Sequence, residues 1–137
     1  MSERRTINDL LESARAGLAR LEPRAAYAES QDGALLVDTR CEELRRSDGV
    51  IPGAIAVPLS VLYWRLDPAS GHDDPHLSDP ARRVILICAH GYSSSLAAAT
   101  LRELGFALAT DVIGGFDQWR REGLPIDVLP RLGDITA

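Results

Sequence analysis

The sequence lacks lysine altogether, has only two cysteines, and contains no apolar run as long as a membrane span. All 15 residues of the lysine and arginine class are arginines, so chemistry that needs a lysine amine is excluded. The net charge is -5 and no basic run occurs, which argues against binding to nucleic acid. A bilayer span needs roughly 20 consecutive apolar residues, and the N-terminal residues also lack the apolar centre of a secretory signal. We therefore expect a cytoplasmic protein whose two thiols are free.

The length and composition are those of one ordinary folded domain. A chain of 137 residues can bury a hydrophobic core without dividing into two units. Its content of 45% apolar and 26% charged residues is typical of globular proteins. No internal repeat is visible, so we expect a single domain.

The apolar pattern predicts strands alternating with helices. Two continuous apolar runs, at residues 34–38 and 83–88, predict strands that are buried on both faces. Residues 6–21 have nearly helical spacing after the N-cap candidate Thr6, although the final "LARLEP" is also compatible with a short edge strand. The other expected elements are helices at residues 24–29, 41–46, 61–66 (capped by Ser60), 93–104 and 114–122, and short strands near residues 56–57 and 110–114. This alternation predicts an α/β fold with a parallel sheet covered on both faces.

Cys88 lies at the carboxyl end of the second buried strand. In parallel α/β sheets, ligands bind at the edge formed by the carboxyl ends of the strands. The next helix is expected to begin at Ser93 or Ser94, and a helix N-terminus binds anions and lowers the pKa of a nearby thiol. Gly91 permits a turn with positive φ, so that successive backbone N–H groups converge, and the serine hydroxyls add donors. The pattern predicts a cradle for a thiolate or its anionic adduct. Cys88 by itself favours a small buried residue at a strand end, and the glycine and serines that follow it turn the interpretation toward a functional thiol.

Five segments, in this order, resemble the rhodanese family of sulfurtransferases. They are "LLVDTR" at residues 35–40, "GVIPGAIAVP" at 49–58, "VILICAHGYSSSLAA" at 84–98, "LGF" at 104–106 and "VIGGFDQW" at 112–119, the last followed by "GLP". The resemblance implies a three-layer α/β fold with a central parallel sheet of about five strands and helices on both faces. It places the core at about residues 18–125, with an N-terminal helix at 6–17 and a C-terminal tail at 126–137 as extensions of one domain.

The resemblance also implies a reaction in which Cys88 is the nucleophile. Its thiolate takes the sulfane sulfur of a donor and passes it, as a persulfide, to cyanide or to a thiol acceptor. The implied partners are a small sulfur donor or a persulfide-bearing protein, and a thiol acceptor. We expect no cofactor, no metal and no binding to nucleic acid or membrane. The oligomeric state is left open. The residues expected to bind the substrate are Arg40, Ala89, His90, Gly91, Tyr92, Ser93 and Ser94. The alternative is a catalytically weak rhodanese-like module that carries sulfur or binds a regulatory partner.

The loop departs from the family where arginine is common. Ala89 and Ser93 stand at positions that often hold arginine, which leaves His90 as the one candidate cation within the loop. Because thiosulfate is a dianion, this loss favours a neutral or protein-bound persulfide as the donor. Related phosphatases need an arginine six residues after the cysteine to hold phosphoryl oxygens, and Ser94 stands there. We therefore expect no phosphatase activity.

Three further features each allow two interpretations. Asp38 and Arg40 form a structural ion pair, or Arg40 helps to draw in an anion. Cys41 is a resolving thiol that forms a disulfide with Cys88, or an ordinary half-buried or solvated cysteine. The "HDDPH" stretch at residues 72–76 is an exposed polar loop or a metal site, and we expect the loop.

Overall fold

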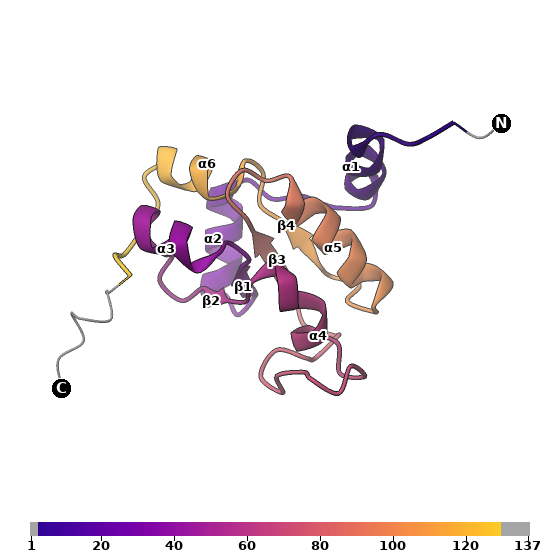
Figure 1. The fold of residues 1–137 in the computed structure, drawn as a ribbon. Helices are drawn as coiled ribbons and strands as arrows, with labels where there is room; N and C mark the ends of the chain where they lie inside the picture. Colours follow the sequence, from indigo (N-terminus) through magenta and orange to yellow (C-terminus); the bar gives the residue numbers. More distant parts are fainter. Residues whose placement is uncertain (1–2, 130–137) are drawn as a thin grey trace.

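The computed structural model describes residues 3–129 and contains a four-stranded parallel sheet (Figure 1). The strand order is β2-β1-β3-β4, with β1 (Leu35–Asp38) and β3 (Val84–Ile87) in the centre. The two-residue strands β2 (Ile55–Ala56) and β4 (Thr110–Asp111) lie on either side. Every pair is parallel, so the carboxyl ends of all four strands meet at one edge.

One further pairing extends the sheet beyond β4. The Leu21 N–H donates to the Asp111 carbonyl at 3.0 Å, and the Ile113 N–H donates to the Leu21 carbonyl at 2.9 Å. Leu21 forms a parallel bridge with Val112, so the edge-strand interpretation of "LARLEP" is confirmed at this residue. Four strands and this bridge agree with the expected sheet of about five strands.

Helices cover both faces of the sheet, as expected (Figure 1). The faces differ because successive residues of a strand point to opposite sides. Leu35 and Val37 belong to the core cluster under the helices at residues 62–66 and 93–103, whereas Leu36 and Ile85 belong to the cluster under the helices at residues 23–31 and 115–121. The helices are α1 (Ile7–Ala16), α2 (Pro23–Gln31), α3 (Glu42–Asp48), α4 (Leu62–Leu66), α5 (Ser93–Glu103) and α6 (Gly115–Arg121), and a 3₁₀ turn, η1 (Leu59–Val61), precedes α4. No helix within residues 3–129 is long and apolar enough to cross a membrane.

The helix ends test three of the expected caps. Thr6 caps α1: its hydroxyl accepts from the Asp9 N–H at 3.1 Å, and the Asp9 carboxylate accepts from the Thr6 N–H at 2.8 Å. Gly105, with φ of +100°, follows the last turn of α5 as predicted. The prediction that Ser60 caps the next helix was wrong, because Ser60 lies inside η1 and Val61 occupies the cap position without a side-chain hydrogen bond.

Both expected extensions contact the core. The N-terminal one is α1, which lies against α5 (Figure 1). In the C-terminal tail, Asp127 forms an antiparallel bridge with Val50, which lies between α3 and β2, with N···O distances of 2.8 and 2.7 Å. The part of the expected tail at residues 130–137 lies outside the described residues.

Candidate active site

Cys88 directly follows β3, and a four-residue loop connects it to the first turn of α5. The thiol is buried, with 6% of the residue exposed. The Gly91 backbone has φ of +83°, as predicted, and its N–H points back at the Cys88 sulfur with an N···S distance of 3.2 Å. The loop therefore curls around the sulfur and presents backbone N–H groups to it.

Burial raises the pKa of the Cys88 thiol, but hydrogen bonds outweigh this effect and bring the pKa below its ordinary value. The donors are the hydroxyls of Ser94 and Ser93, followed by the backbone N–H groups of Ser94 and Gly91. Each of them stabilises the charged sulfur more than the neutral thiol. The Ser94 hydroxyl also lies 2.7 Å from Oδ2 of Asp111, so its single proton is shared between two anionic acceptors. The Ser93 hydroxyl and the two N–H groups consequently carry much of the stabilisation.

The expected substrate-binding residues of the loop differ in exposure. Gly91 and Ser94 are buried, Ala89 and Ser93 are half-buried, and His90 is exposed. Tyr92 is 63% exposed and stands at the rim of the loop, where the Arg15 guanidinium lies 5.7 Å from the centre of its ring.

A cavity of about 70 Å³ lies beside the loop. Ala89 and His90 line it together with Arg40, which reaches the loop from the end of β1. The Arg40 guanidinium stacks 3.7 Å from the centre of the Phe116 ring, and its Nη1 has no hydrogen-bond partner among the described residues. The structure therefore brings Arg40 next to the cysteine loop with one guanidinium nitrogen, Nη1, unused.

The remaining donors of Arg40 serve the fold. Its Nη2 donates to Oδ2 of Asp38 at 2.7 Å and to the Gly49 carbonyl at 2.8 Å, and its Nε donates to Oδ1 of Asp38 at 3.0 Å. Both side chains are almost fully buried. The structural interpretation of the Asp38–Arg40 pair is thus confirmed, whereas a role of Arg40 toward an anion stays a prediction.

The start of α6 holds the outer side of the cysteine loop. The Phe116 N–H donates to the Cys88 carbonyl at 2.8 Å, and the Asp117 N–H donates to the Ala89 carbonyl at 3.0 Å. This approach requires a glycine at position 115, because a Cβ on Gly115 would lie 2.5 Å from the Cys88 carbonyl oxygen. With its carbonyls bound by α6, the loop turns its N–H groups toward the sulfur.

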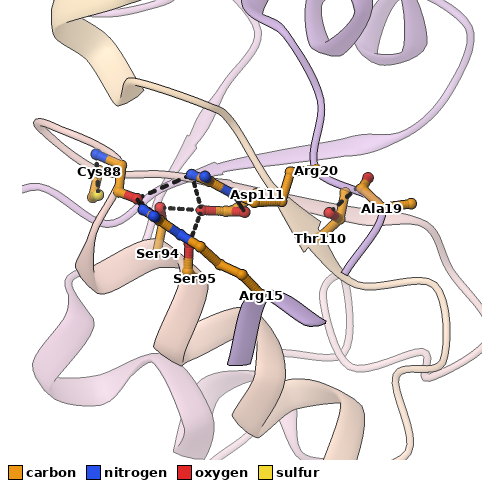
Figure 2. A network of polar contacts seen from close by, with 9 residues as sticks. Arg15, Ala19, Arg20, Cys88, Ser94, Ser95, Thr110 and Asp111 are labelled. Atoms are coloured by element: carbon orange, nitrogen blue, oxygen red, sulfur yellow. Dashed lines mark hydrogen bonds and ion pairs between the residues drawn. The ribbon is translucent and has the colours of Figure 1, made fainter. Parts of the chain in front are cut away.

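Three residues outside the expected set also contact the loop: Arg15, Arg20 and Asp111 (Figure 2). Both arginines donate to the Gly91 carbonyl, at 2.8 Å and 3.0 Å. Oδ1 of Asp111 accepts from Arg20 Nε at 2.8 Å, and Oδ2 accepts from the hydroxyls of two serines, at 2.7 Å from Ser94 and 2.8 Å from the next residue. Sequence reasoning missed the arginines because they precede Gly91 by 76 and 71 residues, and no local pattern joins them to it.

Cys41 and the histidine-rich loop hold the remaining candidate side chains of the sequence. Cys41 is exposed at the N-cap of α3, and both it and Cys88 are free thiols. His72 and His76 are exposed, as expected for a polar loop. No group of three potential metal-ligating side chains occurs within residues 3–129.

The family is decided by comparison with known proteins. The sequence model of the rhodanese-like domain matches residues 22–122. This chain belongs to the rhodanese-like domain family. Among its relatives, the thiosulfate sulfurtransferase GlpE of Haemophilus influenzae is 33% identical over 107 residues, which cover 78% of this chain and 92% of the relative. The protein of the same name from Pseudomonas syringae pv. syringae is 36% identical over 101 residues, covering 74% and 86%.

Two solved structures share the fold of this chain. The polysulfide-sulfur transferase homodimer of Wolinella succinogenes superposes with a TM-score of 0.69 at 26% identity, covering 89% of this chain and 87% of that chain. A Rhodopseudomonas palustris protein of unknown function, described as a possible tyrosine phosphatase, superposes with a TM-score of 0.84 at 29% identity, covering 93% and 98%.

Proposed function

We propose that this rhodanese-like domain is a sulfurtransferase that carries a sulfane sulfur as a persulfide on Cys88. The supporting observation is the buried thiol of Cys88, whose pKa is lowered by hydrogen bonds from the surrounding loop. The relatives from Haemophilus and Pseudomonas are named thiosulfate sulfurtransferases, and the Wolinella protein is named a polysulfide-sulfur transferase. Each of these names describes the movement of a sulfur atom.

In the first step the Cys88 thiolate attacks the sulfane sulfur of the donor. A new S–S bond forms on Cys88, and the donor's bond to that sulfur breaks. The donor leaves with the electron pair, as sulfite from thiosulfate or as a thiolate from a persulfide. The lowered pKa of Cys88 favours this step, because the thiolate is the nucleophilic form.

In the second step an acceptor such as cyanide or a thiolate attacks the outer sulfur of the Cys88 persulfide. The S–S bond breaks and Cys88 leaves as a thiolate, so the chain returns to its starting state without net oxidation. Hydrogen bonds from Gly91 N–H and Ser93 to the Cys88 sulfur make it a better leaving group by stabilising its charge. Both steps use groups of this chain and need no cofactor.

The preferred donor, in this proposal, is a neutral or protein-bound persulfide. The loop itself contains no arginine or lysine, and the exposed His90 is its one basic side chain. Arg40 uses Nε and Nη2 on Asp38 and Gly49, which leaves Nη1 to meet an anion in the small cavity. Thiosulfate, a dianion, gains less from such a site than from a loop that carries its own arginine.

Phosphatase activity is not proposed, despite the description of the Rhodopseudomonas structure. A phosphatase of this fold clamps the phosphoryl oxygens with an arginine six residues after the cysteine. Ser94 stands at that position, is buried, and hydrogen-bonds Asp111.

Cys41 is a candidate resolving thiol for the persulfide. Its thiolate would attack the Cys88 Sγ, form a Cys41–Cys88 disulfide and release hydrosulfide, and a small thiol would then reduce the disulfide. Such a bond needs the two Cα atoms within roughly 7 Å of each other. Peptide mass spectrometry after mild oxidation tests the pairing, and the absence of a Cys41–Cys88 crosslink would exclude it.

The test of the function is the mass of the intact protein after incubation with thiosulfate or with a small alkyl persulfide. We expect the wild type to gain one sulfur atom, located on Cys88, and to lose it to cyanide with formation of thiocyanate. Cys88→Ser should gain none. Retention of the mass gain in Cys88→Ser would refute the proposal, and a stable gain that no acceptor discharges would favour the sulfur-carrier or binding-module alternative.

A further inference from the structure

Two arginines from the N-terminal segment bind one carbonyl of the cysteine loop from outside. Arg15, in α1, and Arg20, just before the Leu21 bridge, both donate through Nη2 to the Gly91 carbonyl (Figure 2). Residues 22–122 match the family model, so both arginines precede the region that the family shares by sequence. Both arginines thus bind the loop at the same peptide group.

This contact determines which way the Gly91–Tyr92 peptide faces. In a trans peptide the C=O and the following N–H point in opposite directions. Because the Gly91 carbonyl points to the arginines, the Tyr92 N–H points away from them, and it has no acceptor within residues 3–129. The preceding N–H, that of Gly91, donates to the Cys88 sulfur. Hydrogen bonds to a carbonyl also polarise its peptide and strengthen the N–H as a donor.

The same contact places positive charge behind the loop. Arg20 is paired with Asp111, whereas Arg15 is in no ion pair among the described residues. Two guanidinium cations and one carboxylate leave one positive charge in excess. The other charged or titratable groups around the loop are the exposed His90 and Tyr92, Asp48 at the end of α3, Asp117 and Arg120 of α6, and Arg40, which Asp38 neutralises.

We propose that Arg15 and Arg20 are positioning residues of the cysteine loop: they hold the Gly91–Tyr92 peptide with its N–H available to an anion on Cys88, and they supply the positive charge that the loop lacks. The proposal deepens the sulfur-transfer function above and rests on it. It assigns to the segment before residue 22 a direct part in the anion cradle. A purely structural role would instead anchor α1 and leave the chemistry of Cys88 unchanged.

Arg15 is the better residue to test. Arg20→Gln would leave the buried Asp111 carboxylate without its cation, and the variant can simply fail to fold. Among residues 3–129 the Arg15 side chain donates to the Gly91 carbonyl at 2.8 Å and to the Ser95 hydroxyl at 3.1 Å, and its guanidinium lies against the Tyr92 ring. Arg15→Met removes the charge and these donors while keeping an unbranched side chain. Arg15→Lys keeps the charge and loses the fork of two donors.

The experiment measures the rate of Cys88 alkylation by iodoacetamide between pH 5 and 10, with peptide mass spectrometry to separate Cys88 from Cys41. We expect Arg15→Met to react roughly threefold more slowly than the wild type at pH 7, and the curve to move to higher pH. Arg15→Lys should recover most of the rate. The matched control is Arg24→Met, which removes an exposed arginine whose polar partner among the described residues is Glu122, and which should leave the curve unchanged.

An Arg15→Met curve that coincides with the wild-type curve would overturn the inference. So would an equal shift in Arg24→Met, which would indicate a general effect of net charge. No sulfur donor is present in this experiment, so its outcome is separate from that of the persulfide test. A wild type that never forms a persulfide refutes the proposed function, whereas an unmoved alkylation curve in a protein that does form one refutes only the role of the arginines.

Discussion

The two central strands of the sheet end side by side, Asp38 opposite Ile87, and each runs into a loop that carries a cysteine. In the loop after β1 the polar groups bind one another: Arg40 closes on Asp38, and Cys41 is left exposed. In the loop after β3 the polar groups face the sulfur, and the Cys88 thiol is buried with a lowered pKa. Two thiols at the same edge of one sheet therefore have different surroundings.

The difference shows that a helix N-terminus alone does not create this thiol site. Cys41 occupies the N-cap of α3, yet its side chain makes no capping hydrogen bond, and two glutamates follow it in the first turn. Cys88 lies five residues before α5, and the loop returns the Gly91 N–H and the Ser93 and Ser94 groups to its sulfur. What distinguishes Cys88 is the set of donors that converge on it.

The largest expected difference between the loops is in activity. Cys88→Ser should lower the rate of sulfur transfer from donor to cyanide by at least about a thousandfold, because a serine hydroxyl is not ionised at neutral pH and forms no persulfide. Cys41→Ser should leave the loading of sulfur onto Cys88 intact and affect only later discharge. Thiocyanate production and the mass of the intact protein measure the two effects. Equal losses of sulfur transfer in Cys88→Ser and Cys41→Ser would contradict the proposed difference between the two loops.

The next largest effect is on stability, where substitution in the loop after β1 should cost more than substitution in the loop after β3. Asp38→Asn removes the charge partner of the buried Arg40 and should lower the free energy of unfolding by about 3 kcal/mol. The control, Glu42→Gln, breaks an exposed pair with Arg46 in the following helix and should change it by less than about 0.5 kcal/mol. Urea denaturation measures both. A loss below about 1 kcal/mol in Asp38→Asn would show that the pair is not structurally important.

A pair of glycines tests the close packing of the β3 loop. Gly91 and Gly53 both have φ of +83°, so an alanine at either position is strained by about 1–2 kcal/mol. A Cβ on Gly53 meets nothing within 4 Å, whereas one on Gly91 would lie 2.8 Å from the Gly114 backbone nitrogen. Gly91→Ala should therefore lower the free energy of unfolding by about 1 kcal/mol more than Gly53→Ala and slow persulfide formation. If both variants lose the same free energy of unfolding in urea denaturation, the β3 loop accommodates the added Cβ without cost and the prediction is wrong.

The smallest effect is the pH dependence of stability. The pKa of the Cys88 thiol is lower in the folded chain than in the unfolded chain, so between these values the unfolded chain binds more protons. The stability of the wild type relative to Cys88→Ala should therefore rise as the pH increases through this interval, and the gain should disappear as the pH falls through the folded-state pKa. Urea denaturation of both proteins from pH 6 to 10 measures it. A relative stability that falls with increasing pH would contradict the lowered pKa.

Local features of the chain could be predicted because neighbouring residues decide them. The apolar runs at residues 34–38 and 83–88 marked β1 and β3, and Thr6 and Gly105 marked two helix ends. The prediction of a Ser60 cap was wrong, although serine is common at helix caps, because a 3₁₀ turn precedes α4 and includes Ser60. The shortest strands were placed only approximately, since two residues carry little periodic signal.

The sequence by itself determined that Cys88 ends a buried strand ahead of a glycine and three serines, and that five segments follow the order of the rhodanese family. Only the tertiary structure decided that Arg15, Arg20 and Asp111 lie behind this loop. It also decided that Arg40 donates most of its hydrogen bonds to Asp38 and Gly49, and that Cys41 is exposed. The physical reason is distance along the chain. A strand or a turn depends on adjacent residues, whereas a hydrogen bond from Arg15 to Gly91 depends on how α1 packs against α5 across 76 positions.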